Sequence, residues 1–378
     1  MQQIAMTWLV YKLTKSEWLL GLVAFSGQIP TAFISPFAGV LTDRWNRHKT
    51  LLITQSLAMT QAFLLAFLTY MNILSVSHII ILAILLGVIN AVDMPLRQTF
   101  LSDIVIRAED LPNALAVNSS MVNTTRLLGP ILTSLVIHFK GEAFCFFLNG
   151  LSYLAVLAAL LKMHVTHHKR KSDEEIFSSL KEGIQYCAST PSIRIVLLTL
   201  SFTSMTTVSL TTLLPFFSDK FFTAGANGLG ILSAILGAGA LTGAIGLAFR
   251  TSHEGLSNII TYATISLGIS MMAFAYSPYA VLSYICLFFS GAANIAQMVA
   301  SNSLLQITSN EDKRGRVLSL YIVSLLGFAP FGNLLAGYLG SHIGAASAVG
   351  ISGLATLLSG FFFHNSLMKQ GLTSKAQL

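Results

Sequence analysis

The sequence predicts an all-α membrane protein with twelve transmembrane helices in two six-helix bundles. Of the 378 residues, 54% are hydrophobic and only 10% are charged, whereas a soluble domain carries roughly 25% charged residues. The apolar residues gather in stretches long enough to cross the roughly 30 Å of a bilayer's hydrocarbon core. The longest polar run lies near the middle of the chain, and it separates two sets of such stretches.

Eleven stretches are long enough to span a membrane as helices. They are residues 18–41, 50–71, 73–95, 113–138, 142–162, 192–217, 227–249, 256–276, 279–303, 316–340 and 343–363. Residues 1–13 are apolar but cover only roughly 20 Å as a helix, and they lack the basic region and cleavage site of a signal peptide. We interpret them as the outer half of a first helix whose beginning is absent from this sequence.

The basic residues predict the orientation. With both chain ends in the cytoplasm, the inner loops and the C-terminal tail hold 17 Lys and Arg residues, the outer loops hold four, and Arg126 lies inside a span. Cytoplasmic loops of membrane proteins carry an excess of Lys and Arg. We therefore expect a multi-pass protein of the bacterial inner membrane with a cytoplasmic C-terminus, and we name its inner and outer ends accordingly.

The chain divides into three predicted parts. Residues 1–162 form the N-terminal bundle, 163–191 a basic cytoplasmic linker with an amphipathic helix, and 192–378 the C-terminal bundle with a short tail. The halves repeat weakly: an acidic pair precedes Gly129 and Pro130 in the first half, and another precedes Gly327 and Pro330 in the second. We expect these glycines and prolines at helix-packing or hinge positions.

The sharpest motif lies between the second and third helices. Residues 39–49 read Gly-Val-Leu-Thr-Asp-Arg-Trp-Asn-Arg-His-Lys, which resembles the signature of the major facilitator superfamily. The resemblance implies a lock between the two halves, formed by Gly39, Asp43, Arg44 and Arg47, that holds the cytoplasmic side closed. The alternative is an ordinary basic loop with a chance aspartate.

A second motif, Asp93-Met-Pro-Leu-Arg97, stands at the inner end of the fourth helix. Together with the residues at 314–317 and 327–332, it resembles the enterobactin-exporter and macrolide-efflux branch of that superfamily, over essentially the whole chain. The resemblance implies export from the cytoplasm, driven by the proton gradient. Alternatively, Asp93 and Arg97 form an interfacial pair that positions the helix end.

Arg126 is the most informative single residue, because an unpaired charge inside a span costs several kcal/mol. It either faces a wet cavity, where it contacts substrate, or is a structural arginine bonded between helices. Polar residues in other spans are expected to turn inward, toward the cavity or toward neighbouring helices. The candidates for coupling or substrate contact are Asp93, Arg97, Asn123, Gln28, Asn90, Asn294 and Gln297.

The composition also limits the function. No Gly-Lys dipeptide occurs, so the chain carries no Walker A loop for ATP, and no constellation of an enzyme stands out. We predict a monomeric carrier of a small amphipathic molecule, with the proton as coupling ion and no cofactor, metal or nucleic acid. The alternatives are an uptake permease of the same fold and a truncated, non-transporting membrane protein or receptor.

Overall fold

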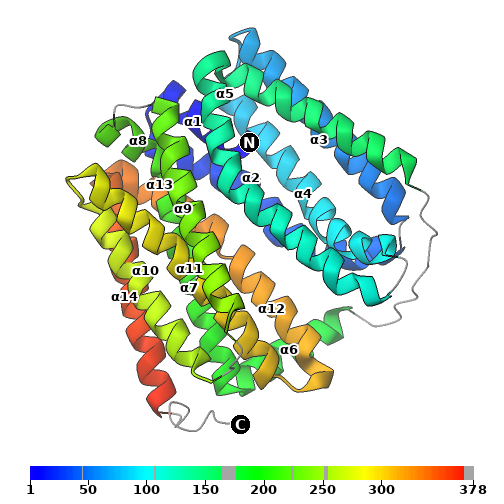
Figure 1. Cartoon of the computed structure of the whole chain (residues 1–378), viewed down its shortest axis with the longest axis vertical. Coiled ribbons are helices and arrows are strands. Elements are labelled where there is room, and N and C mark those ends of the chain that lie inside the picture. Colours follow the sequence, from blue (N-terminus) through cyan, green and yellow to red (C-terminus); the bar gives the residue numbers. More distant parts are fainter. Residues whose placement is uncertain (45, 106–107, 164–175, 223–224, 251–253, 370–378) are drawn as a thin grey trace.

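The computed structural model describes residues 1–44, 46–105, 108–163, 176–222, 225–250 and 254–369 (Figure 1). Every regular element in these ranges is a helix. Ten segments of the described chain are long and apolar enough to cross a membrane. The predicted all-α membrane fold is confirmed.

The first lobe is built from helices that pack lengthwise on one another. They are α1 (Gln2–Thr14), α2 (Glu17–Arg44), α3 (Arg47–Tyr70), α4 (Val76–Ile104) and α5 (Leu111–Lys162), with the short 3-10 helix η1 (Ala108–Asp110) before α5. α2 packs along α4, α3 packs along α5, and the short α1 packs against α5 and α2. Side-chain caps from Asn46 and Ser75 bind free backbone N–H groups at the starts of α3 and α4, which fixes where these helices begin.

Two predicted spans of the first lobe, 113–138 and 142–162, belong to the single element α5. Its backbone is non-helical at Gly141, where φ is 81° and ψ is 174°. Only glycine adopts such angles at little cost. The chain therefore turns at Gly141, and the two spans keep separate directions although no loop joins them.

The second lobe follows the helix α6 (Ile176–Ser189). It contains α7 (Pro191–Thr212), α8 (Leu214–Phe222), α9 (Gly225–Ala248), α10 (Leu256–Ala275), α11 (Ala280–Thr308), η2 (Glu311–Lys313), α12 (Arg314–Leu326), α13 (Ala329–Ile343) and α14 (Ala345–Lys369). α10 packs against both α11 and α14, and α9 packs against α11. Small residues allow these close approaches: a Cβ atom on Gly239 or Gly291 would overlap the backbone of the facing helix.

The predicted span 316–340 is broken in its middle. α12 ends at Leu326, and α13 begins at Ala329 with Pro330 in its first turn. Proline has no N–H to donate to the carbonyl four residues earlier, at Leu326, and its ring clashes with that carbonyl, so Pro330 accounts for the break. The Ser204 hydroxyl donates to the Leu325 carbonyl at 2.5 Å, which gives one carbonyl near the end of α12 a partner from α7.

The two lobes meet at their predicted outer ends (Figure 1). α2 packs against α13, α5 against α9, and α1 against α8. One hydrophobic cluster joins the lobes here, with Trp8 and Leu9 from α1 and Phe217 and Leu229 from the second lobe. The ribbons diverge toward the inner ends of α4 and α12.

Candidate functional site

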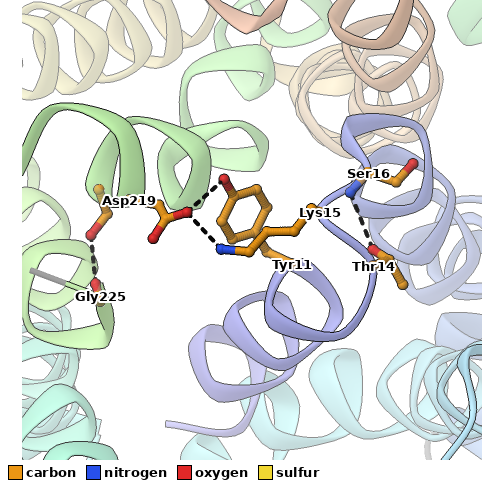
Figure 2. Close-up of polar contacts among 7 residues, drawn as sticks. Tyr11, Thr14, Lys15, Ser16, Asp219 and Gly225 are labelled. Atoms are coloured by element: carbon orange, nitrogen blue, oxygen red, sulfur yellow. Dashed lines mark hydrogen bonds and ion pairs between the residues drawn. The ribbon is translucent and has the colours of Figure 1, made fainter. Parts of the chain in front are cut away.

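Three side chains bring α1 and α8 together across the lobe interface (Figure 2). The Tyr11 hydroxyl donates a hydrogen bond to Asp219 Oδ2 at 3.1 Å, and Lys15 Nζ lies 2.6 Å from the same oxygen. The Lys15 ammonium also lies 4.6 Å from the centroid of the Tyr11 ring. The side chains of Lys15 and Asp219 are 57% and 37% exposed, so this outer cluster of Tyr11, Lys15 and Asp219 lies at the rim of the interface.

Deeper in the interface, a chain of polar side chains crosses from α7 to α2. The Thr212 hydroxyl donates to Asn333 Oδ1 at 2.6 Å, and Asn333 Nδ2 donates to Gln28 Oε1 at 3.0 Å. Beside it, the rings of Phe25 and Phe331 meet edge to face, with centroids 6.1 Å apart. Asn333 is buried, whereas Gln28 is half-buried and Phe331 is exposed. Polar and aromatic groups from both lobes therefore meet at one place.

A third contact joins α5 and α9. Asn227 Nδ2 and His138 Nδ1 lie 3.0 Å apart, which makes a hydrogen bond when the imidazole nitrogen is the acceptor. Nearby, a Cβ atom on Gly230 would overlap the Ser134 side chain. The backbone of α9 is thus in close contact with α5 at this point.

These contacts lie toward the outer ends of the membrane-spanning segments, and the deepest of them, at Phe331 and Asn333, lies just on the outer side of the middle of the segment Glu311–Ile343. The described part of the interface is therefore closed at the outer end. Glycine packing makes the closure tight, because a Cβ atom on Gly21 would lie 2.5 Å from the Asn333 carbonyl oxygen and 2.7 Å from the Gly337 Cα.

Asp93 lies inside the first lobe, between α4 and α3. It is 3% exposed. Its Oδ1 accepts hydrogen bonds from Thr54 Oγ1 at 2.7 Å and Gln55 Nε2 at 2.6 Å, and its Oδ2 lies 2.5 Å from Arg97 Nε. The Arg97 side chain is 57% exposed. The carboxylate is thus held by two neutral donors and one cation that lies at the protein surface.

The sequence predicts Asp93 at the inner end of the fourth helix. The residue lies within the membrane-spanning segment Val76–Phe100, about 25 Å along the helix from Val76. α4 continues to Ile104, beyond the span predicted at 73–95. Asp93 is therefore a buried acid in the inner third of α4.

A network of buried amides continues through the first lobe. Gln2 Nε2 donates to Gln61 Oε1 at 2.6 Å, and Asn149 Nδ2 donates to Gln2 Oε1 at 2.7 Å. These bonds tie α1, α3 and α5 together, since a polar group without a partner is costly in an apolar interior.

The other predicted residues are distributed over both lobes. Gln297 is buried, and its amide donates to Thr203 Oγ1 at 2.9 Å, which joins α11 to α7 as the packing alternative expects. Asn90 and Asn294 are half-buried on α4 and α11, and Arg47 is the first residue of α3. Gly129 and Pro130 lie in α5, while Gly327 and Pro330 flank the break between α12 and α13.

Five predicted residues cannot be placed further. Gly39, Asp43 and Arg44 belong to α2, and Asn123 and Arg126 belong to α5. The side chains of all five lie outside the described part of the structure. Sequence reasoning in turn missed Asp219 and Lys15 as site residues. The one available signal was that each follows an apolar stretch at its outer end.

A helical membrane protein of two lobes that close on each other at one end, with polar groups at their interface, is built as a carrier. The model of the transmembrane secretion effector family matches residues 1–377, and the chain belongs to this family. As a member of this family it is a membrane transporter and not an enzyme.

Relatives of known function match the chain over nearly its whole length. The staphyloferrin A transporter of Staphylococcus aureus is 25% identical over 97% of this chain and 92% of its own. The multidrug efflux pump Tap of Mycolicibacterium fortuitum is 24% identical, covering 94% and 89%. The enterobactin exporter EntS of Shigella boydii is 23% identical, covering 93% and 84%.

Solved structures share the fold. The nucleoside transporter NupG superposes with a TM-score of 0.78 at 14% identity, over 97% of this chain and 96% of its own. A D-xylose-proton symporter superposes with a TM-score of 0.75 at 14% identity, over 96% and 93%. The chain therefore has the major facilitator fold.

Proposed function

We propose that this transporter exports a small amphipathic molecule from the cytoplasm across the bacterial inner membrane by alternating access, driven by the proton gradient. The observation that carries the proposal is the closure of the lobe interface at its outer end, seen in the described residues of α1, α2, α8, α9 and α13. A carrier closed at one end and rocking about a central site exposes that site to each side in turn. The names of the relatives, an exporter and an efflux pump among them, support the outward direction.

The substrate site lies between the lobes, near the polar chain that ends at Gln28. Its half-buried amide and the exposed ring of Phe331 offer hydrogen bonding beside an apolar face, which suits an amphipathic ligand. Arg126 and Asn123 complete the site from α5, and Asn90 and Asn294 extend it. In this proposal Arg126 binds the anionic or strongly polar part of the substrate.

The gates and the coupling group complete the cycle. Asp43 and Arg44 lock the inner face when the outer face opens, with Gly39 allowing a close helix approach and Arg47 adding a positive charge. Asp93 exchanges the proton, because a carboxylate in a span that alternates between a protonated and an ion-paired state moves charge without an unpaired ion. Arg97 is its partner in the ionised state. The protein works as a monomer with a cytoplasmic C-terminus.

The test uses an efflux-deficient bacterial host that expresses the chain. Intracellular retention of staphyloferrin A, enterobactin, a macrolide and a cationic dye is followed with and without a protonophore. Protonophore-sensitive loss of one compound supports proton-driven export, whereas gain of a compound instead indicates an uptake permease. No change for any compound contradicts this substrate class.

Arg126→Ala tests the site itself. We expect affinity for the exported compound to fall by at least tenfold in the purified protein, because one hydrogen bond to a charged group contributes about 1.5–3 kcal/mol. The measurement is isothermal titration calorimetry. The control is Gln61→Ala, which alters a buried amide of the first lobe away from the interface, and unchanged affinity in Arg126→Ala would make Arg126 a structural residue.

A further inference from the structure

Lys15 has an unusual backbone for its residue type. It follows α1 with φ 49° and ψ 26°, in the left-handed region, and its backbone N–H donates to the Tyr11 carbonyl at 2.7 Å. Glycine is the usual residue at such a helix end, because a Cβ atom disfavours these angles. In the described chain only Lys15 and Asn72 adopt a positive φ without being glycine. A strained residue that persists points to a role for its side chain.

The side chain of Lys15 contacts both lobes. The left-handed turn returns the chain at the end of α1, and the ammonium group lies between the Tyr11 ring and Asp219 (Figure 2). A glycine would complete the same helix end but would leave Asp219 with only the Tyr11 hydroxyl among its described partners. The ion pair across the interface therefore depends on lysine at a position where the backbone favours glycine.

Both partners of this ion pair are fixed in their own lobes. α1 is held in the first lobe by Lys12, whose ammonium lies 2.8 Å from Glu142, and by the amide network of Gln2. α8 is held in the second lobe by Phe217, whose ring centroid lies 4.6 Å from that of Phe274, and by Ser218, which donates to the Gly225 carbonyl at 2.6 Å. When the lobes separate at their outer ends, the outer cluster must break.

We propose that Lys15, Tyr11 and Asp219 form a latch that sets how often the outer gate of this carrier opens. The inference rests on the alternating access of the proposed function and adds Asp219 and Lys15 to it as gating residues. Neither residue contacts substrate in this proposal. They act on the balance between the two conformations and hence on the rate of turnover.

The test measures the conformational balance directly, in the full chain in lipid nanodiscs and without substrate. Nitroxide labels are attached at Tyr70→Cys, at the outer end of α3, and at Tyr279→Cys, just before α11. These tyrosines are 72% and 71% exposed, while Cys145, Cys187 and Cys286 are buried. Double electron–electron resonance then gives the distribution of distances between the lobes.

Two variants open the latch in different ways. Lys15→Gly removes the cation and relaxes the backbone, and Asp219→Asn removes the anion but keeps an acceptor for Tyr11. We expect each to raise the ratio of the long-distance to the short-distance population about 2- to 5-fold, which corresponds to the roughly 0.5–1 kcal/mol of a partly exposed ion pair. We expect the thermal stability of Lys15→Gly to be equal to or higher than that of the wild type, because the strain is gone. A loss of stability without a distance shift would show a merely structural role.

The matched control is Glu142→Gln. This variant removes the ion pair between Glu142 and Lys12 of α1, which lies entirely within the first lobe. The distribution of distances between the lobes should therefore not change. A double variant that exchanges the two charges, Lys15→Asp with Asp219→Lys, should restore the short distance between the labels, since aspartate tolerates left-handed backbone angles. Unchanged distributions in both single variants, or an equal shift in Glu142→Gln, would overturn the latch. A shift in the variants combined with a failure to export would contradict the proposed function and leave the latch standing.

Discussion

Asp93 is a carboxylate inside a membrane-spanning helix, and its hydrogen bonds make the buried charge tolerable. Two neutral donors from α3 hold one oxygen and Arg97 holds the other. Protonation of Asp93 would weaken its ion pair with Arg97, because a neutral carboxyl group attracts the guanidinium far less than a carboxylate does.

We therefore predict that Asp93→Asn uncouples transport from the proton gradient. Asparagine cannot exchange a proton, although it keeps the size of the side chain and an acceptor for Thr54. Any export that remains should be the same with and without a protonophore, while substrate affinity changes less than threefold. The measurement is transport into inverted vesicles with an imposed pH gradient, and Asp93→Glu serves as the control that keeps the acid. Export by Asp93→Asn that still follows the gradient would assign the coupling to another group.

The two acids of this transporter differ in how far the sequence could predict them. Asp93 stands in a recognisable motif, so the sequence singled it out, but its partners Thr54 and Gln55 follow only from the packing of α4 against α3. Asp219 has its partners about two hundred positions away in the chain, at Tyr11 and Lys15. Such a pair becomes visible only when the lobes are placed together.

At the scale of helices, glycine packing separates contacts within a lobe from contacts between lobes. Gly21 on α2 faces the Asn333 carbonyl and Gly337 on α13, in the other lobe. Gly268 on α10 faces α14 within one lobe, and a Cβ atom there would lie 2.5 Å from the Leu357 backbone nitrogen. A methyl group at either site has no room, but only one of them affects how the lobes meet.

We predict that Gly21→Ala shifts the carrier toward the state with an open outer face. Overpacking of a tight contact costs typically 1–3 kcal/mol, and separation of the lobes relieves that cost. The long distance between labels at positions 70 and 279 should become the main population, with a small change in melting temperature. Gly268→Ala should instead lower the melting temperature by several degrees without a change in that distance. Equal behaviour of the two variants would contradict this division of roles.

The helix pattern itself was predictable from the sequence, and its irregularities were less so. Apolar runs gave the correct order of membrane-spanning segments because the length of a span is fixed by the bilayer. The break before α13 has a visible cause in Pro330, but hydropathy alone placed one unbroken helix over it. At Gly141 the sequence indicated two helices, and the backbone joins them by a single non-helical residue.

At the scale of the whole molecule, transport depends on a balance between two arrangements of the lobes. The outer cluster stabilises the arrangement described here, and in the proposed function Asp43 stabilises the opposite one. A carrier that is held too firmly in either arrangement turns over slowly, because each cycle passes through both. The two gates therefore act on one equilibrium from opposite directions.

This balance predicts that weakening both gates restores transport lost by weakening one. Asp43→Asn alone should lower the export rate with expression intact, because the inner lock is lost and the inward-facing state accumulates. Adding Lys15→Gly should move the equilibrium back by about 2- to 5-fold, as free energies of distant sites add. Export by the double variant should then exceed that of Asp43→Asn by a similar factor in a cell-based efflux assay. Adding Glu142→Gln instead of Lys15→Gly should restore nothing, and a double variant slower than Asp43→Asn would mean that the two gates do not share one equilibrium.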